Sequence, residues 1–176
     1  MRIISGKYRG KTIFPGKEFK ARPTTDFAKE GLFNILTNSV DFEQIKVLDL
    51  FAGTGGIGFE FASRGSVQVD AVENSYKHHD FIRKTARDLQ FENYKAIKGD
   101  ALKYIERCPF KYDIIFADPP FDWEHTEKLP DAIYGAGILA PEGIFILEHS
   151  KRVTFAGNPK LYDHRIYGNL HFSFFK

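Results

Sequence analysis

One tetrapeptide combines residue types that could do chemistry together. Asp118-Pro119-Pro120-Phe121 follows the apolar run 112–117. Proline fixes φ, lacks an N–H and restricts the residue before it, so the chain leaves this run as a rigid, extended segment. The Asp118 side chain and the Pro119 carbonyl can therefore be held as two fixed hydrogen-bond acceptors.

Two such acceptors suit methyl transfer to an exocyclic amino group of a nucleobase. The lone pair of that amino group is delocalised into the base, so it becomes nucleophilic only when hydrogen bonds orient both N–H groups. Phe121 would stack on the base and hold it in place, and Trp123 is either a second stacking ring or part of the core. The target base must be single-stranded, looped out or flipped to reach the pocket. As an alternative, the segment is a proline-stiffened strand exit with Asp118 in a turn.

A glycine-rich loop and three carboxylates predict a cofactor site at the same edge. The loop Gly53-Thr54-Gly55-Gly56-Ile57-Gly58 follows an apolar strand, and Glu73 ends the next strand, where it could accept hydrogen bonds from two ribose hydroxyls. Asp49, inside the first strand, could meet the amino group of a methionine moiety and would repel a pyrophosphate, which argues against NAD. Asp100 could accept from an adenine amino group. Alternatively, the three carboxylates only cap strand ends and helix starts.

The elements that must position these residues alternate along the chain. A helix is expected from the Thr24–Asp26 caps to about Thr37, and strands are expected in KVLDLFA, VQVDAVE, YKAIKGD, YDIIFADPP and GIFILEHS, with helices between them. Continuous apolar strands separated by helices predict a parallel sheet covered on both faces. LYDHRIYG and LHFSFFK, separated by Gly168-Asn169, predict a closing antiparallel hairpin. We therefore expect an α/β, doubly wound, mostly parallel seven-stranded sheet of the Rossmann-like type.

The positive charge is concentrated at the N-terminal end. Residues 1–22 hold seven Lys and Arg against one Glu, a net of +6 in a chain whose total is +2. Arg2 to Phe14 is expected to form two short strands around Gly6–Gly10, as a small basic appendage. Such a segment is the footprint of a phosphate-backbone contact or, alternatively, a solvated hairpin face. We expect residues 1–22 to be an RNA-binding β-hairpin extension and 23–176 to be the catalytic domain.

Composition excludes several other classes of protein. The 176 residues suffice for one substantial core. Apolar runs stay short of the roughly 20 residues that span a bilayer, and Cys108 is the only cysteine, so no membrane association and a cytoplasmic location are expected. The six histidines lack zinc-type spacing, so no metal is expected. The absence of a G-x-S-x-G nucleophile elbow weakens a hydrolase interpretation.

Taken together, these segments resemble one family, the bacterial 16S rRNA guanine-N2 methyltransferases of the type that modifies guanine 966. The resemblance covers nearly the whole chain and is carried by 2–10, 22–26, 48–55, 63–65 and Asp118–Phe121; Lys29 stands where the family often has Arg. It implies S-adenosylmethionine as methyl donor and, as partner, 16S rRNA or a small-subunit assembly intermediate, with the protein a monomer. It also implies catalysis by Asp118, Pro119, Pro120 and Phe121, cofactor binding by Asp49, Ala52, Gly53, Thr54, Gly55, Glu73, Asn74, Asp100, Ala101 and Asp118, and RNA binding by Arg2, Lys7, Arg9, Lys11 and Arg22.

Two other functions stay open at this point. One is an adenine-N6 methyltransferase acting on DNA or RNA, because the 118–121 segment does not separate guanine from adenine. A DNA enzyme would normally need a target-recognition domain, for which this chain has no room. The other is a non-catalytic methyltransferase-fold module that binds RNA, which should have lost a crevice residue, whereas Asp49, Glu73, Asp100 and Asp118 are all present.

Overall fold

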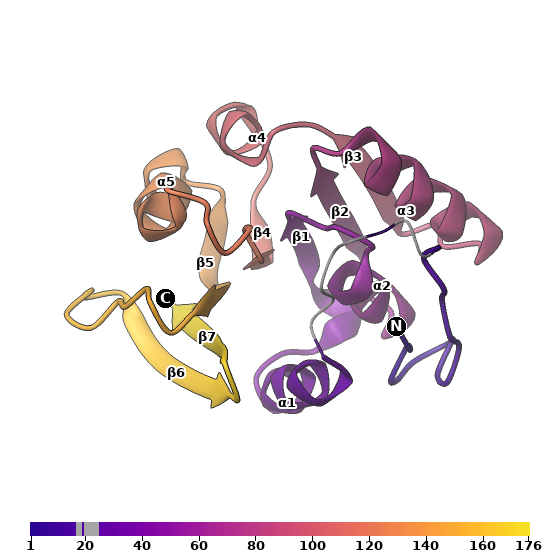
Figure 1. Ribbon diagram of the computed structural model, residues 1–176, viewed down its shortest axis with the longest axis horizontal. Coiled ribbons are helices and arrows are strands. Elements are labelled where there is room, and N and C mark those ends of the chain that lie inside the picture. Colours follow the sequence, from indigo (N-terminus) through magenta and orange to yellow (C-terminus); the bar gives the residue numbers. More distant parts are fainter. Residues whose placement is uncertain (17–18, 20–24) are drawn as a thin grey trace.

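The centre of the molecule is a mixed sheet with strand order β3-β2-β1-β4-β5-β7-β6 (Figure 1), seen in a computed structural model that describes residues 1–16, 19 and 25–176. Strands β1 to β5 run parallel, and β7 pairs antiparallel with β5 and β6. The doubly wound, mostly parallel sheet and its antiparallel closing hairpin are therefore confirmed. The strands are β1 Lys46–Leu50, β2 Gln68–Glu73, β3 Tyr94–Lys98, β4 Tyr112–Ala117, β5 Leu139–Ser150, β6 Leu161–Tyr167 and β7 Leu170–Phe175.

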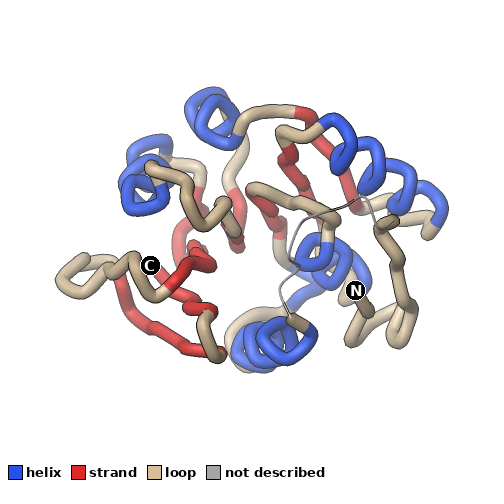
Figure 2. Tube along the Cα trace, in the orientation of Figure 1, coloured by secondary structure: helices blue, strands red, loops and turns tan. Residues whose placement is uncertain are grey.

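Helices cover both faces of the sheet (Figure 2). Buried side chains of α1, α2 and α3 belong to one apolar cluster, and those of α4 and α5 belong to another on the opposite face. The helices are α1 Asp26–Thr37, α2 Gly56–Ser63, α3 Tyr76–Asp88, α4 Ala101–Arg107 and α5 Leu129–Ala136, with 3-10 turns η1 Phe42–Gln44 and η2 Thr126–Lys128.

Local signals explain where these helices begin and end. Side chains of Thr25, Ser75 and Asp100 accept hydrogen bonds from backbone N–H groups in the first turns of α1, α3 and α4. Pro130 lies in the first turn of α5, and Gly137 ends that helix with a φ of 65°. The α1 prediction, with its end near Thr37, is confirmed.

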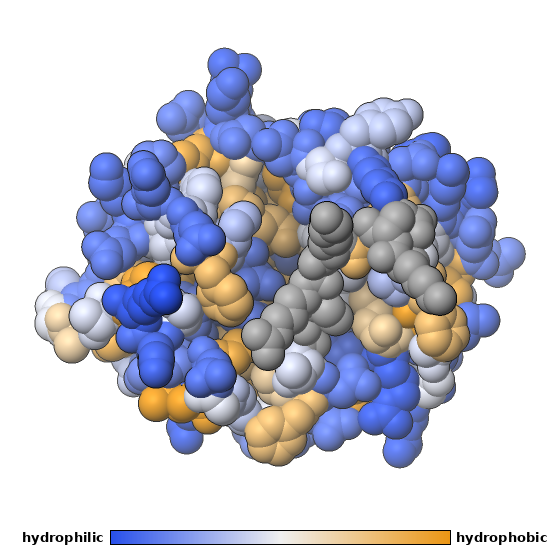
Figure 3. Space-filling view, in the orientation of Figure 1, coloured by the Kyte–Doolittle hydropathy of each residue, from blue (hydrophilic) through white to orange (hydrophobic). Residues whose placement is uncertain are grey.

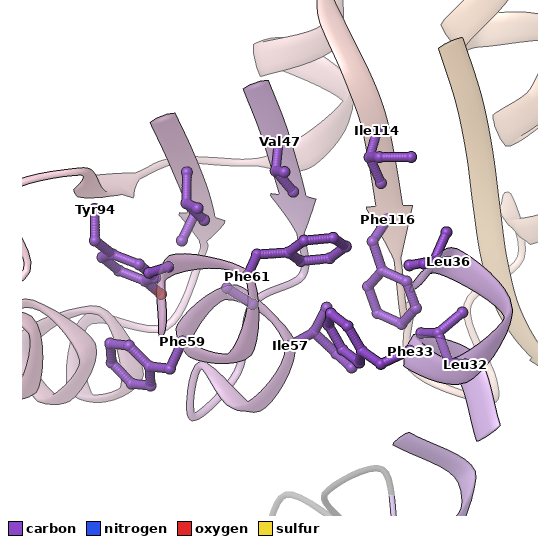
Figure 4. Packing of buried hydrophobic residues seen from close by; sticks show 14 of the residues in the cluster. Leu32, Phe33, Leu36, Val47, Ile57, Phe59, Phe61, Tyr94, Ile114 and Phe116 are labelled. Carbon is purple, nitrogen blue, oxygen red and sulfur yellow. The ribbon is translucent and has the colours of Figure 1, made fainter. Parts of the chain in front are cut away.

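The core fixes the strands against the helices (Figure 4). Phe33 of α1 and Phe61 of α2 are fully buried, with ring centroids 4.7 Å apart. Both pack in the cluster that contains Val47 of β1 and Ile114 and Phe116 of β4. Each such side chain contributes roughly 1.5–3 kcal/mol by leaving water. The strand ends that carry the site are therefore held on a rigid base.

Two segments differ from the sequence expectation. Strand β5 begins at Leu139, before the predicted GIFILEHS, and its pairing with β4 shifts register between Tyr112 and Ile114. Tyr112 pairs with Leu139 and Ile114 pairs with Ile144, so β5 has extra residues between these two pairs. Glu142, with a φ of 62°, is one of them. The helix expected between YDIIFADPP and GIFILEHS starts as a 3-10 turn at Thr126 and becomes α-helical at Leu129.

The N-terminal segment is a closed hairpin with little strand character. Arg2 and Thr12 form a single antiparallel bridge, where two short strands were expected. Ile3 and Ile13 are buried in the core cluster, and the Lys7 N–H donates to the Ser63 carbonyl at 2.7 Å. The segment is thus docked on the end of α2 and is not a detached appendage.

Candidate active site

The carboxyl ends of the parallel strands open onto one cavity of about 730 Å³. The loops that follow β1, β2, β3 and β4 all contribute to its wall, as expected for parallel strands whose order reverses at β1 and β4. Predicted residues on the wall are Gly53, Glu73, Asn74, Asp100, Ala101, Asp118, Pro119, Pro120 and Phe121.

Glu73 ties two of these loops together. One carboxylate oxygen accepts the Gly53 N–H at 2.7 Å, and the other accepts the Ser75 N–H at 2.6 Å. Each oxygen keeps a lone pair for a further donor. The carboxylate is thus fixed at the cavity wall, where it can take the two hydroxyls of a ribose.

The loop after β1 is held in a conformation that brings backbone close to the cavity. Phe51 has a φ of 61°, which is unusual for a residue with a side chain, and Gly53 and Gly55 have φ of 54° and 83°. A Cβ at Gly53 would meet only the Phe51 carbonyl, at 3.8 Å. Gly53 therefore leaves open space beside the backbone that a ligand can fill.

Asp49 lies beneath this loop, behind the cavity wall. The residue is 2 % exposed, and its carboxylate accepts the Gly58 N–H in the first turn of α2 at 3.0 Å. Burial, outweighing that hydrogen bond, raises the pKa of Asp49 to about 8, and the nearby Asp118 and Glu73 carboxylates add to the rise. Asp49 thus supports the start of α2. Ala52, Thr54 and Gly55 also lie in the loop and off the wall, and Ala52 and Thr54 are buried.

Asp100 begins α4 at the end of β3. One of its carboxylate oxygens accepts the Lys103 N–H at 3.1 Å, so the residue does cap a helix. It also lines the cavity beside Gly99 and Ala101, and Asn74 lines it from the loop after β2. The second oxygen of Asp100 can accept from an adenine amino group while the first keeps its capping role.

Asp118 lines the cavity directly after β4. Burial raises the pKa of its carboxyl to about 7. Its backbone N–H continues the β1–β4 pairing to the Leu50 carbonyl at 3.4 Å. Across the described residues, no hydrogen bond engages the Asp118 side chain, so both oxygens can turn to a substrate.

The two aromatic residues after Asp118 have different surroundings. Phe121 is 55 % exposed at the cavity wall. Trp123 also lines the cavity, but it is half-buried: it packs edge to face on Phe51, with centroids 4.9 Å apart, and against the core cluster of that face. Phe121 therefore has the free ring surface that stacking on a base requires.

Several wall residues were not anticipated from the sequence. Glu148, near the end of β5 and 3 % exposed, follows the same strand-end rule that located Asp118, and that rule could have found it. Tyr167 and 168–170 come from the β6–β7 hairpin, and Thr25 precedes α1. The hairpin brings its residues to the cavity from far along the chain, so no local motif marks them as wall residues.

The charge of the wall fits a cationic, amino-bearing ligand. Four carboxylates line the cavity, those of Glu73, Asp100, Asp118 and Glu148, and no Lys or Arg lines it in the part of the chain that the structure describes. Such a wall would repel a pyrophosphate and attract a sulfonium and an amino group. The residues therefore fit S-adenosylmethionine.

The predicted RNA-binding residues lie outside the cavity. Lys7, Arg9 and Lys11 are exposed on the hairpin. Arg2 is also exposed, but it pairs with Glu30 at 3.3 Å and lies 3.9 Å from Asp26. Arg22 falls outside the described residues.

The end of α2 holds this hairpin in place. The buried Glu60 carboxylate accepts the N–H groups of Ile4 and Ser5 at 2.7 and 3.0 Å and pairs with Arg64 at 2.9 Å. A Cβ at Gly6 would lie 1.8 Å from the Ser63 carbonyl oxygen, so the approach requires glycine. Residues 63–65, which contributed to the family resemblance, thus anchor the basic hairpin.

Lys29 has a structural place in the same region. It is 2 % exposed, its ammonium donates to the Arg2 carbonyl, and burial lowers its pKa. Lys29, which stands where the family often has Arg, therefore helps to attach the hairpin to α1.

Neither a membrane span nor a metal cluster is found in the described ranges. No helix there is long and apolar enough to cross a bilayer. No three His, Cys, Asp or Glu residues are grouped there as metal ligands.

Comparisons with known proteins agree with this geometry. A family model described as "Conserved hypothetical protein 95" matches residues 1–176. Ribosomal RNA small subunit methyltransferase D of Escherichia coli strain K12 is 30% identical over 84% of this chain and 74% of its own length. The protein of the same name from Buchnera aphidicola (subsp. Baizongia pistaciae) is 36% identical over 69% of this chain, and the match spans 61% of that relative's length.

A solved structure extends the similarity to the whole fold. The Escherichia coli protein described as "Putative methyltransferase yhhF" superposes with a TM-score of 0.85 at 28% identity, covering 99% of this chain and 96% of that one. The fold is that of S-adenosylmethionine-dependent methyltransferases. The chain belongs to the Conserved hypothetical protein 95 family, the family of the ribosomal RNA small subunit methyltransferase D proteins.

Proposed function

We propose that this protein transfers a methyl group from S-adenosylmethionine to the exocyclic N2 amino group of one guanine in 16S rRNA. The observation that carries the proposal is the position of Asp118–Phe121 on the wall of the same cavity as Glu73 and Asp100. The names of the relatives support an rRNA substrate. We further propose that it works as a monomer in the cytoplasm, on 16S rRNA or on a small-subunit assembly intermediate.

The cofactor half of the cavity is formed by the loops after β1, β2 and β3. Glu73 would hold the ribose hydroxyls, Asp100 the adenine amino group and Gly53 the methionine moiety, with Asn74 and Ala101 beside the nucleoside. Asp49 would act from beneath by keeping the start of α2 in place. When bound, S-adenosylmethionine supplies an electrophilic methyl group on a sulfonium.

The substrate half is built around Asp118. Its carboxylate and the Pro119 carbonyl would accept the two N–H bonds of the guanine amino group and turn the nitrogen lone pair toward the methyl group. Phe121 would stack on the base. The nitrogen gains a methyl group and must lose one proton, and the Asp118 carboxylate, with its pKa of about 7, is placed to accept it.

RNA would reach the cavity across the N-terminal hairpin. Lys7, Arg9 and Lys11 present three exposed positive charges on a segment that Glu60 and Ser63 anchor to the catalytic domain. Phosphate contacts of this kind position a nucleic acid without reading its sequence. The choice of base would then be made inside the cavity.

The test is to locate the transferred methyl group. The protein is incubated with S-adenosylmethionine carrying a labelled methyl and with either naked 16S rRNA or small subunits from a strain that lacks the enzyme. We expect labelled N2-methylguanosine at one position. Labelled N6-methyladenosine, or no transfer to either substrate, would contradict the proposal, and the comparison of the two substrates shows which assembly state is methylated.

A further inference from the structure

An exposed aromatic side chain, that of Phe27, lies against the wall of the cavity. Phe27, in the first turn of α1, is 72 % exposed, and its ring packs edge to face against Tyr167, with centroids 5.8 Å apart. Tyr167 ends β6 and itself lines the cavity. Figure 1 shows this end of β6 next to α1, and Figure 3 shows an apolar side chain on the largely hydrophilic surface over α1.

Tyr167, the ring on which Phe27 packs, is held from behind. A Cβ at Gly31 of α1 would lie 2.3 Å from the Tyr167 ring, so helix and ring are in close contact. Tyr167 also packs against the buried Phe172 of β7 at 5.7 Å. A large aromatic surface left in water costs free energy, and here the support for that surface is in place before any ligand arrives.

The surface is continuous with the substrate half of the cavity. Thr25, two residues before Phe27, lines the cavity together with 167–170, Glu148 and Phe121. A base that leaves its stack to enter the cavity deprives its neighbour of a stacking partner. Aromatic side chains replace such a partner for single-stranded RNA, largely independently of sequence.

We propose that Phe27, supported by Tyr167, is a stacking platform for the nucleotide next to the methylated guanine. The inference rests on the proposed function, since it assumes an extruded base in the cavity. The occupant is RNA because Phe27 packs on Tyr167, which lines the same cavity as Asp118 and Phe121, where the target base would be held. Phe27 would then contribute to RNA binding and not to methyl transfer itself.

The test uses substitutions at Phe27, whose exposure makes the fold insensitive to them. Phe27→Ala removes the ring, Phe27→Leu keeps an apolar side chain without a ring face, and Phe27→Tyr keeps the ring. Phe110→Ala is the matched control, because Phe110 is 56 % exposed just before β4, at the opposite end of that strand from Asp118. KM and kcat are measured with whichever of naked rRNA or small subunits the wild type methylates, together with cofactor affinity.

We expect Phe27→Ala and Phe27→Leu to raise KM for RNA roughly 5- to 100-fold, the range for loss of one base–aromatic stack, with kcat and cofactor affinity unchanged. Phe27→Tyr and Phe110→Ala should match wild type. An rRNA fragment with 2-aminopurine next to the target guanine should be quenched on binding to wild type and to Phe27→Tyr, but not to Phe27→Ala.

Three outcomes would overturn the platform. They are a wild-type KM for RNA in Phe27→Ala, an equal rise in KM in Phe110→Ala, or a wild-type KM in Phe27→Leu. An effect on assembled subunits without any change in binding of the naked fragment would assign the surface to a protein neighbour and would also overturn it. Failure of the proposed function is distinguishable, because the wild type itself would then place no methyl on guanine.

Discussion

The function and the surroundings of the Asp118 carboxyl group favour opposite protonation states. It must be ionised to accept the amino N–H groups and the departing proton, yet its partly enclosed position raises its pKa to about 7. A bound sulfonium would favour the charged form and lower that pKa again. The cofactor thus helps to create the acceptor that its own methyl transfer requires.

This coupling predicts a characteristic pH dependence. In wild type, kcat/KM for S-adenosylmethionine should rise with pH through an inflection near 7, because the cofactor-free enzyme must lose the Asp118 proton. The inflection in kcat should lie at lower pH, because the cofactor is then bound. Both are measured as initial methyl-transfer rates between about pH 5.5 and 8.5.

Asp118→Asn is the control for that assignment. The amide offers one acceptor oxygen and no titration, so the variant should keep part of the activity and lose the inflection. A wild-type profile that is flat across neutral pH, or an inflection that persists in Asp118→Asn, would show that another group titrates.

The attachment of the basic hairpin to the catalytic domain determines where its positive charges lie. Ile3 and Ile13 are buried, and Glu60 and Ser63 bind the hairpin backbone, which leaves the cationic side chains outward. The positive charge is thereby presented at a fixed place relative to the cavity.

Replacing Lys7, Arg9 and Lys11 together by Gln should weaken RNA binding more than cofactor binding. Three lost phosphate contacts should reduce the slope of log affinity against log salt by about 2 for a single strand. Fluorescence anisotropy at several salt concentrations measures this slope. An unchanged slope would refute phosphate contact by these residues. Replacing the exposed Lys103, Arg107 and Lys111 together by Gln, in and just after α4, is a control with the same charge change.

Sequence predicted the elements better than it predicted their attachments. Strand and helix periods, the cap at Thr25 and the turn at Gly168 are local, so they located most element boundaries. The single-bridge hairpin and the β5 irregularity depend on distant contacts, such as those of Glu60 with Ile4. Local pattern contains no information on such pairs.

In the candidate site, too, local signals were predictable from the sequence and distant contacts were not. Glu73, Asp100 and Asp118 follow strands, and parallel topology places them together without further information. Asp49 follows the same pattern but is covered by the glycine loop, which only packing reveals. Tyr167 and Phe27 meet through the closing hairpin, and nothing near them in sequence marks the contact.

At the scale of the whole molecule, the site is maintained at some cost in stability. Asp49 is buried with a pKa raised from 3.8 to about 8, so folding favours its protonated form. The contribution of this group is most favourable below about pH 4 and is lost progressively as pH rises through about 8.

Asp49→Asn should therefore flatten the pH dependence of the free energy of unfolding between about pH 5 and 8 and raise stability at pH 8 relative to wild type. Its amide oxygen can still accept the Gly58 N–H. Urea unfolding at several pH values measures the effect, with Asp131→Asn, on the exposed side of α5, as the control. Equal slopes for wild type and Asp49→Asn would contradict the buried-acid interpretation.

Methyl transfer by Asp118→Ala, in a single turnover with cofactor already bound, tests the role of Asp118 most directly. We predict a folded protein with wild-type cofactor affinity and RNA binding, and a transfer rate at least about 100-fold below wild type, because the amino group loses its fixed acceptor. A rate within a few-fold of wild type would show that the lone pair is oriented by other groups and would contradict the proposed mechanism.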